Sequence, residues 1–328
     1  MAQSEPPGPG RRGWSHRVEP RVTALLARAR RRPSRQAERL LFAVSLLTFV
    51  GAAVVAAGRF PDAQPDIRWG LLAAAGLVGM PANIVLNAAE FHIIGRFVNQ
   101  RVPAARAVKV TVLGSAANLL PIPGSTLVRV QALVADKARY RDAIAASIAV
   151  GVLSVGANLI LAGLAQAQRA PATVVLGLVG AGVAVTAIAL AAVATVRSHA
   201  PTARLSWAAF GIEVLYASVS AVRLWVILLA LGLEVPLASA FALAATGSLA
   251  TAVGFFPAGL GIREALIGAI SPLVGLPLAA GLAGAVVERL FWFVVLAIAA
   301  GIILLRTGAK PSALTSGDPL GSPAGREP

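Results

Sequence analysis

The sequence predicts an all-α polytopic membrane protein with six spanning helices and two broken, re-entrant hairpins arranged as an inverted repeat. Three observations lead to this fold class. Of the 328 residues, 57% are hydrophobic and only 13% are charged, about half the charged share of an ordinary soluble domain. Mean hydropathy is +0.77, and apolar runs of the ~20 residues that cross a bilayer recur along the chain. The basic residues fall mostly between these runs on one predicted side.

A basic tail comes first, at residues 1–39. It holds ten of the 29 Lys and Arg residues immediately before the first apolar run, as expected of a cytoplasmic segment. Within it, Val22, Leu25 and Leu26 lie at helical spacing among arginines. That pattern fits an anionic lipid surface as well as a solvated tail that sets the topology. The net charge of +15 does not indicate nucleic-acid binding, because no aromatic interleaving or nucleic-acid motif accompanies it.

Six apolar runs are long enough to span the membrane. They are residues 40–58, 69–89 (continuing as helix to 97), 143–166, 173–196, 207–233 and 278–305. Two further apolar stretches, 111–134 and 238–274, are interrupted by proline and glycine around Pro121-Ile122-Pro123-Gly124 and Pro257-Ala258-Gly259. Proline removes a helical donor and clashes with the preceding turn. Non-helical backbone at membrane depth is tolerated only inside protein or beside a cavity, so we predict a re-entrant hairpin at each break.

The distribution of basic residues predicts the orientation. If both hairpins return to their own side and the N-terminus is cytoplasmic, the cytoplasm receives 22 of the 29 Lys and Arg residues and the outside receives three. The remaining four lie within apolar segments: Arg129, Arg223, Arg263 and Arg289. This bias predicts both termini on the cytoplasmic side of the cytoplasmic (inner) membrane.

An internal repeat relates the two broken stretches. At a shift of 133 residues, Val102-Pro103, Ala107 and Gly114-Ser115 recur as Val235-Pro236, Ala240 and Gly247-Ser248, and Glu90 corresponds to Arg223. After one inserted residue, Pro123 and Arg129 recur as Pro257 and Arg263. We therefore expect two repeats, residues 40–166 and 172–305. Three crossings per repeat make the second copy inverted, a recurrent transporter design with the substrate bound between the repeats.

The residues around the second break carry a family resemblance. The segment 256–265, Phe-Pro-Ala-Gly-Leu-Gly-Ile-Arg-Glu-Ala, resembles the Pro-Gly-Gly-Leu-Gly-x-Arg-Glu-Ala signature of the lysylphosphatidylglycerol synthase transmembrane family, also called the flippase-like domain family. Asn118-Leu119-Leu120-Pro121 with Arg129 resembles its first motif, although Ser125-Thr126 stand where the family usually has Gly-Glu. Residues 285–290 are similar to its final helix, which carries an Arg-Leu pair, so the resemblance covers roughly residues 40–305.

The resemblance implies a translocase of a phospholipid or lipid-linked intermediate. The family's best-known members carry this domain on aminoacyl-phosphatidylglycerol synthases, and others accompany glycosyltransferases. Here we expect a stand-alone membrane domain at 40–305 with a disordered cytoplasmic tail at 306–328. The expected partners are the lipid substrate, the membrane and a separate synthase or glycosyltransferase. No feature of the sequence indicates an oligomeric state.

Two alternatives remain open at this stage. The chain is a non-transporting scaffold or regulator of a separate lipid- or glycan-modifying enzyme, or it is an integral membrane transferase with Glu264 and Glu288 as acid and base. No nucleophile or cofactor motif accompanies these carboxylates, so we expect neither enzyme activity nor a cofactor. Cysteine is absent, and the three histidines lie far apart, so no metal site is predicted.

The candidate substrate-binding residues gather around the two breaks and the last helix. Arg129 and Arg263 lie about one turn past a break, where exposed N–H groups and the helix dipole favour an anion, and arginine grips phosphate with two donors. The alternative is that Arg263-Glu264 and Glu288-Arg289 neutralise each other, and that the glycines serve backbone geometry. The full candidate set is Asn118, Gly124, Arg129, Gly259, Gly261, Arg263, Glu264, Glu288 and Arg289.

Overall fold

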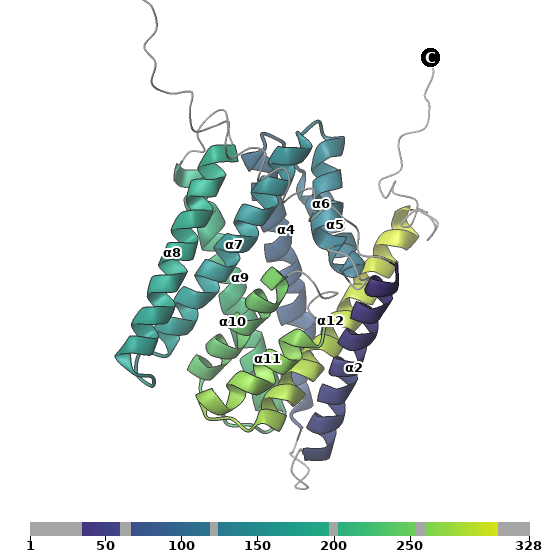
Figure 1. Cartoon of the computed structure of the whole chain (residues 1–328). Helices are drawn as coiled ribbons and strands as arrows, with labels where there is room; N and C mark the ends of the chain where they lie inside the picture. The colour runs from purple at the N-terminus through teal and green to yellow at the C-terminus, as the bar shows by residue number, and fades with distance from the viewer. Residues whose placement is uncertain (1–34, 60–66, 119–123, 197–202, 254–259, 308–328) are drawn as a thin grey trace, which may run out of the picture. The chain divides into compact units, whose positions relative to one another are not determined.

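The computed structural model describes residues 35–59, 67–118, 124–196, 203–253 and 260–307, and within these ranges all regular structure is helical (Figure 1). The tails at 1–34 and 308–328 lie outside the described residues. The chain divides into two compact units, Met1–Leu40 and Leu41–Pro328, and the arrangement below lies within the second. The helices are α2 (Arg35–Arg59), α3 (Trp69–Ala74), the π-helix η1 (Ala75–Gly79), α4 (Met80–Phe97), α5 (Ala104–Ala117), α6 (Gly124–Ala135), α7 (Tyr140–Ala165), α8 (Ala172–Val196), α9 (Ala203–Ala230), α10 (Leu237–Val253), α11 (Ile262–Ile270), the 3₁₀ helix η3 (Ser271–Val274) and α12 (Leu278–Thr307).

The chain is a multi-pass membrane protein. Among the described residues, five helical stretches are long and apolar enough to cross a membrane: Trp69–Phe97, Tyr140–Ala165, Ala172–Ala194, Ala203–Ala230 and Leu278–Ile303. They correspond to five of the six predicted spans. The remaining prediction, at residues 40–58, falls within α2, whose described apolar part is the shorter stretch Ala43–Gly58.

Both interrupted stretches form pairs of short helices. The first contains α5 and α6, of 14 and 12 residues, and the second contains α10 and α11, of 17 and 9 residues. At 1.5 Å per residue, a 12-residue helix extends about 18 Å, which is less than the ~30 Å hydrocarbon core. Figure 1 shows α5 and α6 toward one end of the second unit and α10 and α11 toward the other. The predicted breaks at 119–123 and 254–259 lie outside the described residues.

The turns that follow α4 and α9 are built alike. Each contains a residue with positive φ, Asn99 at 58° and Gly232 at 75°, and these two positions are 133 residues apart. The same shift relates further contacts: Gln100 N–H to Gly95 O at 2.8 Å and Leu233 N–H to Leu228 O at 3.0 Å, and the ring of His92 to Val102 O at 2.7 Å and that of Trp225 to Val235 O at 2.8 Å. The spacing seen in the sequence therefore also relates equivalent local structures.

Helix α9 lies at the centre of the packing. Its apolar residues contribute to each of the three buried clusters, through Ala209 in one, Ile227 in the second and Leu224 in the third. Its neighbour is the helix formed by η1 and α4. From start to end, Gly79, Asn83 and Glu90 lie beside Arg223, Ser220 and Glu213 in that order. The numbering rises along one helix as it falls along the other, so α4 and α9 are antiparallel.

Candidate functional site

Polar side chains line one face of α9. Glu213, Tyr216, Ser220 and Arg223 are spaced by three, four and three residues, which places them on the same side of a helix. Glu213 and Arg223 are only 2% and 8% exposed. Charged groups are costly inside a membrane and persist there when they are paired or functional, so this face marks the interior of the site.

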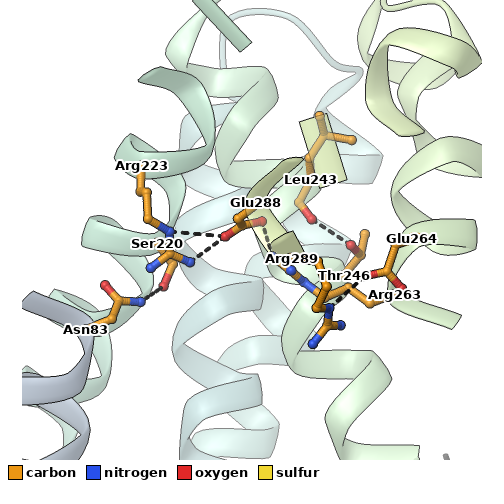
Figure 2. Close-up of polar contacts among 9 residues, drawn as sticks. All are labelled: Asn83, Ser220, Arg223, Leu243, Thr246, Arg263, Glu264, Glu288 and Arg289. Atoms are coloured by element: carbon orange, nitrogen blue, oxygen red, sulfur yellow. Dashed lines mark hydrogen bonds and ion pairs between the residues drawn. The ribbon is translucent and has the colours of Figure 1, made fainter. Parts of the chain in front are cut away.

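The part of α4 that faces α9 carries polar residues at the same helical spacing of three and four. Asn83, Asn87 and Glu90 follow one another at spacings of four and three. The amide of Asn83 donates to the hydroxyl of Ser220 at 2.7 Å, as Figure 2 shows. The two helices therefore meet along a seam of polar side chains.

Arg223 is placed by an irregular turn of the neighbouring helix. The π-helix η1 ends at Gly79, two residues before Pro81. Proline has no backbone N–H to donate, and its ring clashes with the carbonyl one turn earlier. Single π turns of this kind often occur at functional sites. A Cβ on Gly79 would lie 3.0 Å from Cγ of Arg223, so the arginine stem packs closely against this glycine.

Helices α11 and α12 exchange two ion pairs crosswise. Arg263 of α11 donates to Glu288 of α12, and Arg289 of α12 donates through Nε to Glu264 of α11 at 2.9 Å (Figure 2). Glu264 is 0% exposed and Glu288 is 1% exposed. The structure thus brings together four of the predicted site residues, in the mutually neutralising arrangement that the sequence left open beside phosphate binding.

Glu288 also forms an ion pair with a second arginine, Arg223. Its Oε1 accepts from Nε of Arg223 at 3.2 Å and also from Nη2, while its Oε2 accepts from Arg263. Among the described residues the network therefore holds three guanidinium groups and two carboxylates, a formal excess of one positive charge. Excess charge is costly in a buried site, so this part of the interior suits an anion.

Gly261 and Gly247 shape the backbone around Arg263. Gly261 has a φ of +82°, and a Cβ there would lie 2.7 Å from Cβ of Thr48; its N–H donates to Oε2 of Glu264 at 2.7 Å. A Cβ on Gly247 of α10 would lie 2.9 Å from Nε of Arg263. The predicted backbone role of Gly261 fits this geometry, and Gly247 gives the Arg263 side chain its room.

Arg129 lies in a separate group. Its Nη1 donates to Oε1 of Glu90 at 2.9 Å, its Nη2 contacts Oε2 of Glu90 at 3.5 Å and also donates to Asn87, and the guanidinium lies 5.9 Å from the centre of the Phe91 ring. Arg129 and Arg263 are equivalent in the predicted repeat, yet their partners differ. In that alignment Arg223 takes the position of Glu90, and Arg263 pairs with Glu288 of α12 instead.

Asn118 and Gly124 hold the junction between α5 and α6. The side-chain oxygen of Asn118 accepts the N–H of Ser125 at 2.6 Å, which satisfies a free donor at the start of α6. A Cβ on Gly124 would collide with the carbonyl of Ala117. Both residues support the backbone that carries Arg129. The remaining candidate, Gly259, lies outside the described residues.

Glu213, Tyr216 and Asn87 were not among the predicted site residues. Glu213 lies against Ser154 of α7 and close to Glu90 and Arg129. A carboxylate inside the predicted span 207–233 is itself a signal of function, and it was available in the sequence. Asn87 carries no charge, so only its spacing from Glu90 pointed to it.

Tyr216 feels charges from both groups, the one around Arg129 and the one around Glu288. Glu90 and Glu213 act on it from one group, and Arg223 and Arg263 act on it from the other. Both groups of charges therefore lie close enough to act on the same side chain.

The described residues show no group suited to a metal ion, and the cavity found among them is not at the charged network. No group of three His, Cys, Asp or Glu residues suited to a metal ion occurs in the part of the chain that the structure describes. A cavity beside Arg68 and Glu234, at the turn between α9 and α10, contains none of the network's residues.

These features define a class: a polytopic helical membrane domain with a buried network of arginines and glutamates. The family model of the lysylphosphatidylglycerol synthase TM region matches residues 36–300, and the chain belongs to this family. The match confirms the resemblance drawn from the segment 256–265. It covers the membrane region, and no catalytic domain is part of it. A search of curated proteins found no match to the chain.

Proposed function

We propose that this protein is a translocase that moves a phospholipid or lipid-linked intermediate across the cytoplasmic membrane. The observation that supports the proposal best is the group that Arg223, Arg263 and Arg289 form with two glutamates within the described part of the chain. A lipid headgroup carries a phosphate, and buried arginines with one surplus positive charge suit it in charge and in hydrogen-bond geometry. Family membership is consistent with a lipid-related role in the membrane.

We further propose six spans, two re-entrant hairpins and an inverted repeat, with both termini cytoplasmic. The 25 residues of α2 extend about 37 Å as a helix, enough to cross the hydrocarbon core. The antiparallel course of α4 and α9 supports inversion, because these helices occupy equivalent places in the two repeats. The opposite positions of the α5–α6 and α10–α11 pairs in Figure 1 agree with it.

In this proposal the two repeats alternate in opening the polar interior to either side of the membrane. The headgroup phosphate replaces Glu288 as a partner of Arg263 or Arg223. That exchange is less costly at Arg263 than at Arg129, because Glu288 is shared between two arginines whereas Glu90 bonds Arg129 through both oxygens. The second hairpin is therefore the principal headgroup site, and Arg129 anchors the first.

Reconstitution in liposomes tests the function. Vesicles with and without the protein receive phospholipids that are fluorescently labelled at the headgroup, and a membrane-impermeant quencher reports movement between leaflets. We expect the protein to accelerate movement and Arg263→Ala to abolish the acceleration. Arg169→Ala, in the exposed turn between α7 and α8, is the matched control and retains it. Equal rates for protein-containing and empty vesicles, across anionic and zwitterionic labels, would contradict a translocase.

The scaffold alternative is motivated by the ten basic residues of the tail at 1–39, which suit docking of a separate synthase or glycosyltransferase. Here we infer that the membrane domain itself catalyses no reaction. Deleting residues 1–35 separates the two functions. A variant that moves lipid in liposomes at the wild-type rate but fails to complement a deletion strain indicates that docking is the cellular role.

A further inference from the structure

Glu213 is distinguished from the other glutamates of the polar interior by its partners. Glu90 pairs with Arg129, Glu264 with Arg289, and Glu288 with two arginines. Glu213 is 2% exposed, and within the described part of the chain it makes no ion pair.

Charged and polar groups from four helices surround Glu213. Glu90 lies on α4, Arg129 on α6, Ser154 on α7 and Tyr216 on α9 itself. Arg129 already bonds both oxygens of Glu90 and the amide of Asn87. This part of the interior thus holds two carboxylates for one guanidinium.

Charge balance connects the group around Glu213 with the group formed by Arg223, Arg263 and Arg289 and their two glutamates. The interior contains four arginines, at 129, 223, 263 and 289, and four glutamates, at 90, 213, 264 and 288, so it is neutral when every group is ionised. Binding one anionic headgroup at Arg263 adds a negative charge at membrane depth, where uncompensated charge is costly. One proton on Glu213 restores neutrality, because Glu213 is the glutamate that no arginine holds.

The position of Tyr216 makes the two events sensitive to each other. It lies between Glu213 and Arg223 on the polar face of α9 and is close enough to Glu213 and Arg263 to feel the charge of both. A proton is a better fit than a metal cation, because hard metal cations require several oxygen ligands at once, whereas a proton needs one. The positive charge of Arg129, which lies near Glu213, also repels a metal cation, whereas a proton bonds to the carboxyl of Glu213 and neutralises it.

We propose that Glu213 binds one proton with each anionic headgroup, so that lipid and proton cross the membrane in the same direction. The proposal rests on the translocase function and names its energy source, the proton gradient. Binding linkage is reciprocal, so an anionic headgroup at Arg263 favours proton uptake at Glu213, and proton uptake favours headgroup binding.

The test uses the full chain in liposomes with fluorescent phosphatidylglycerol and an imposed pH gradient. We expect an acidic compartment on the side where the lipid starts to raise the rate of movement about tenfold, within the usual range of coupling between sites. Glu213→Gln removes the response to the gradient, and Glu213→Asp, which keeps a titratable carboxyl, restores it. Glu234→Gln, at an exposed carboxylate in the turn after α9, behaves as the wild type.

Each other outcome has a distinct meaning. If the protein moves lipid equally fast with and without the pH gradient, or if Glu213→Gln keeps the response, proton coupling is overturned while the translocase function stands. A response to a sodium gradient alone overturns it as well. If no lipid moves, infrared difference spectra of the purified protein over a pH titration decide separately. The proton site predicts a protonated carboxyl band that Glu213→Gln removes, and its absence at every pH overturns the proposal.

Discussion

At the scale of single residues, the buried glutamates differ in the number of arginines with which each one pairs. Glu288 accepts from Arg223 on α9 and from Arg263 on α11, so it joins three helices. Glu264 instead combines one arginine with a backbone N–H at the start of α11. Replacing one or the other should therefore produce different effects on stability and on the local fold.

Glu288→Gln leaves two guanidinium groups without their carboxylate. Removing one partner of a buried ion pair typically costs ~3–5 kcal/mol, and we expect a loss of that size in the free energy of unfolding. Chemical unfolding in detergent micelles, followed by tryptophan fluorescence, measures it. Glu234→Gln, at an exposed position, should change stability by less than ~0.5 kcal/mol. Equal stability of the two variants would show that the Glu288 pairs contribute nothing to the fold.

The charged residues of the interior could be identified from the sequence, but most of their partners could not. Arg129, Arg263 and Arg289 are conspicuous because arginine is rare in apolar segments. Their partners depend on which faces of distant helices meet, and Arg129 lies 39 residues from Glu90. Glu213 was overlooked because it occurs in a regular span with no proline break to mark it.

At the scale of elements, local patterns determine much of what is seen. Five spans follow from apolar runs, since burial of such runs in the bilayer depends on length and composition alone. The short helices around each break follow from proline and glycine. The π-helix η1 was not predicted, because Pro81 alone does not specify whether a helix kinks, ends or widens by one residue.

The start of α11 offers a prediction with a matched control. Gly261 and Gly275 have nearly the same φ, +82° and +81°, but a Cβ on Gly261 would lie 2.7 Å from Thr48 whereas nothing lies within 4 Å of one on Gly275. Alanine in the left-handed region costs ~1–2 kcal/mol. Gly275→Ala, at a position in that region with ψ of 20°, should show that cost alone. Gly261→Ala should exceed it by ~1–3 kcal/mol, because its ψ of −47° lies outside the region and because its Cβ overpacks against α2. Thermal unfolding of the two variants measures the difference, and equal losses would mean that neither the contact with Thr48 of α2 nor the backbone conformation of Gly261 adds a cost.

At the scale of the whole molecule, the proposed repeat accounts for one chain holding both an acidic and a basic group. In that proposal, duplication places a polar position on α4 and its equivalent on α9 on facing helices, and these positions have since diverged. The residues at 83, 87 and 90 are Asn, Asn and Glu, and those at 216, 220 and 223 are Tyr, Ser and Arg. A symmetric pair would have placed like charges together. Divergence instead gives one half of the interior an extra carboxylate and the other an extra guanidinium, the asymmetry on which proton coupling depends.

The proposed topology can be tested by cysteine labelling, because the chain has no cysteine of its own. If α5–α6 returns to its own side, Arg101→Cys and Lys137→Cys react with a membrane-impermeant maleimide from the same side, the cytoplasmic one, and so only after permeabilisation. If α10–α11 returns to the opposite side, Glu234→Cys and Leu273→Cys react in intact cells. All four positions are exposed, so lack of reaction reports sidedness and not burial. Opposite sidedness within either pair would make that pair a full crossing, and it would reverse the orientation of every later helix and remove the basis for an inverted repeat.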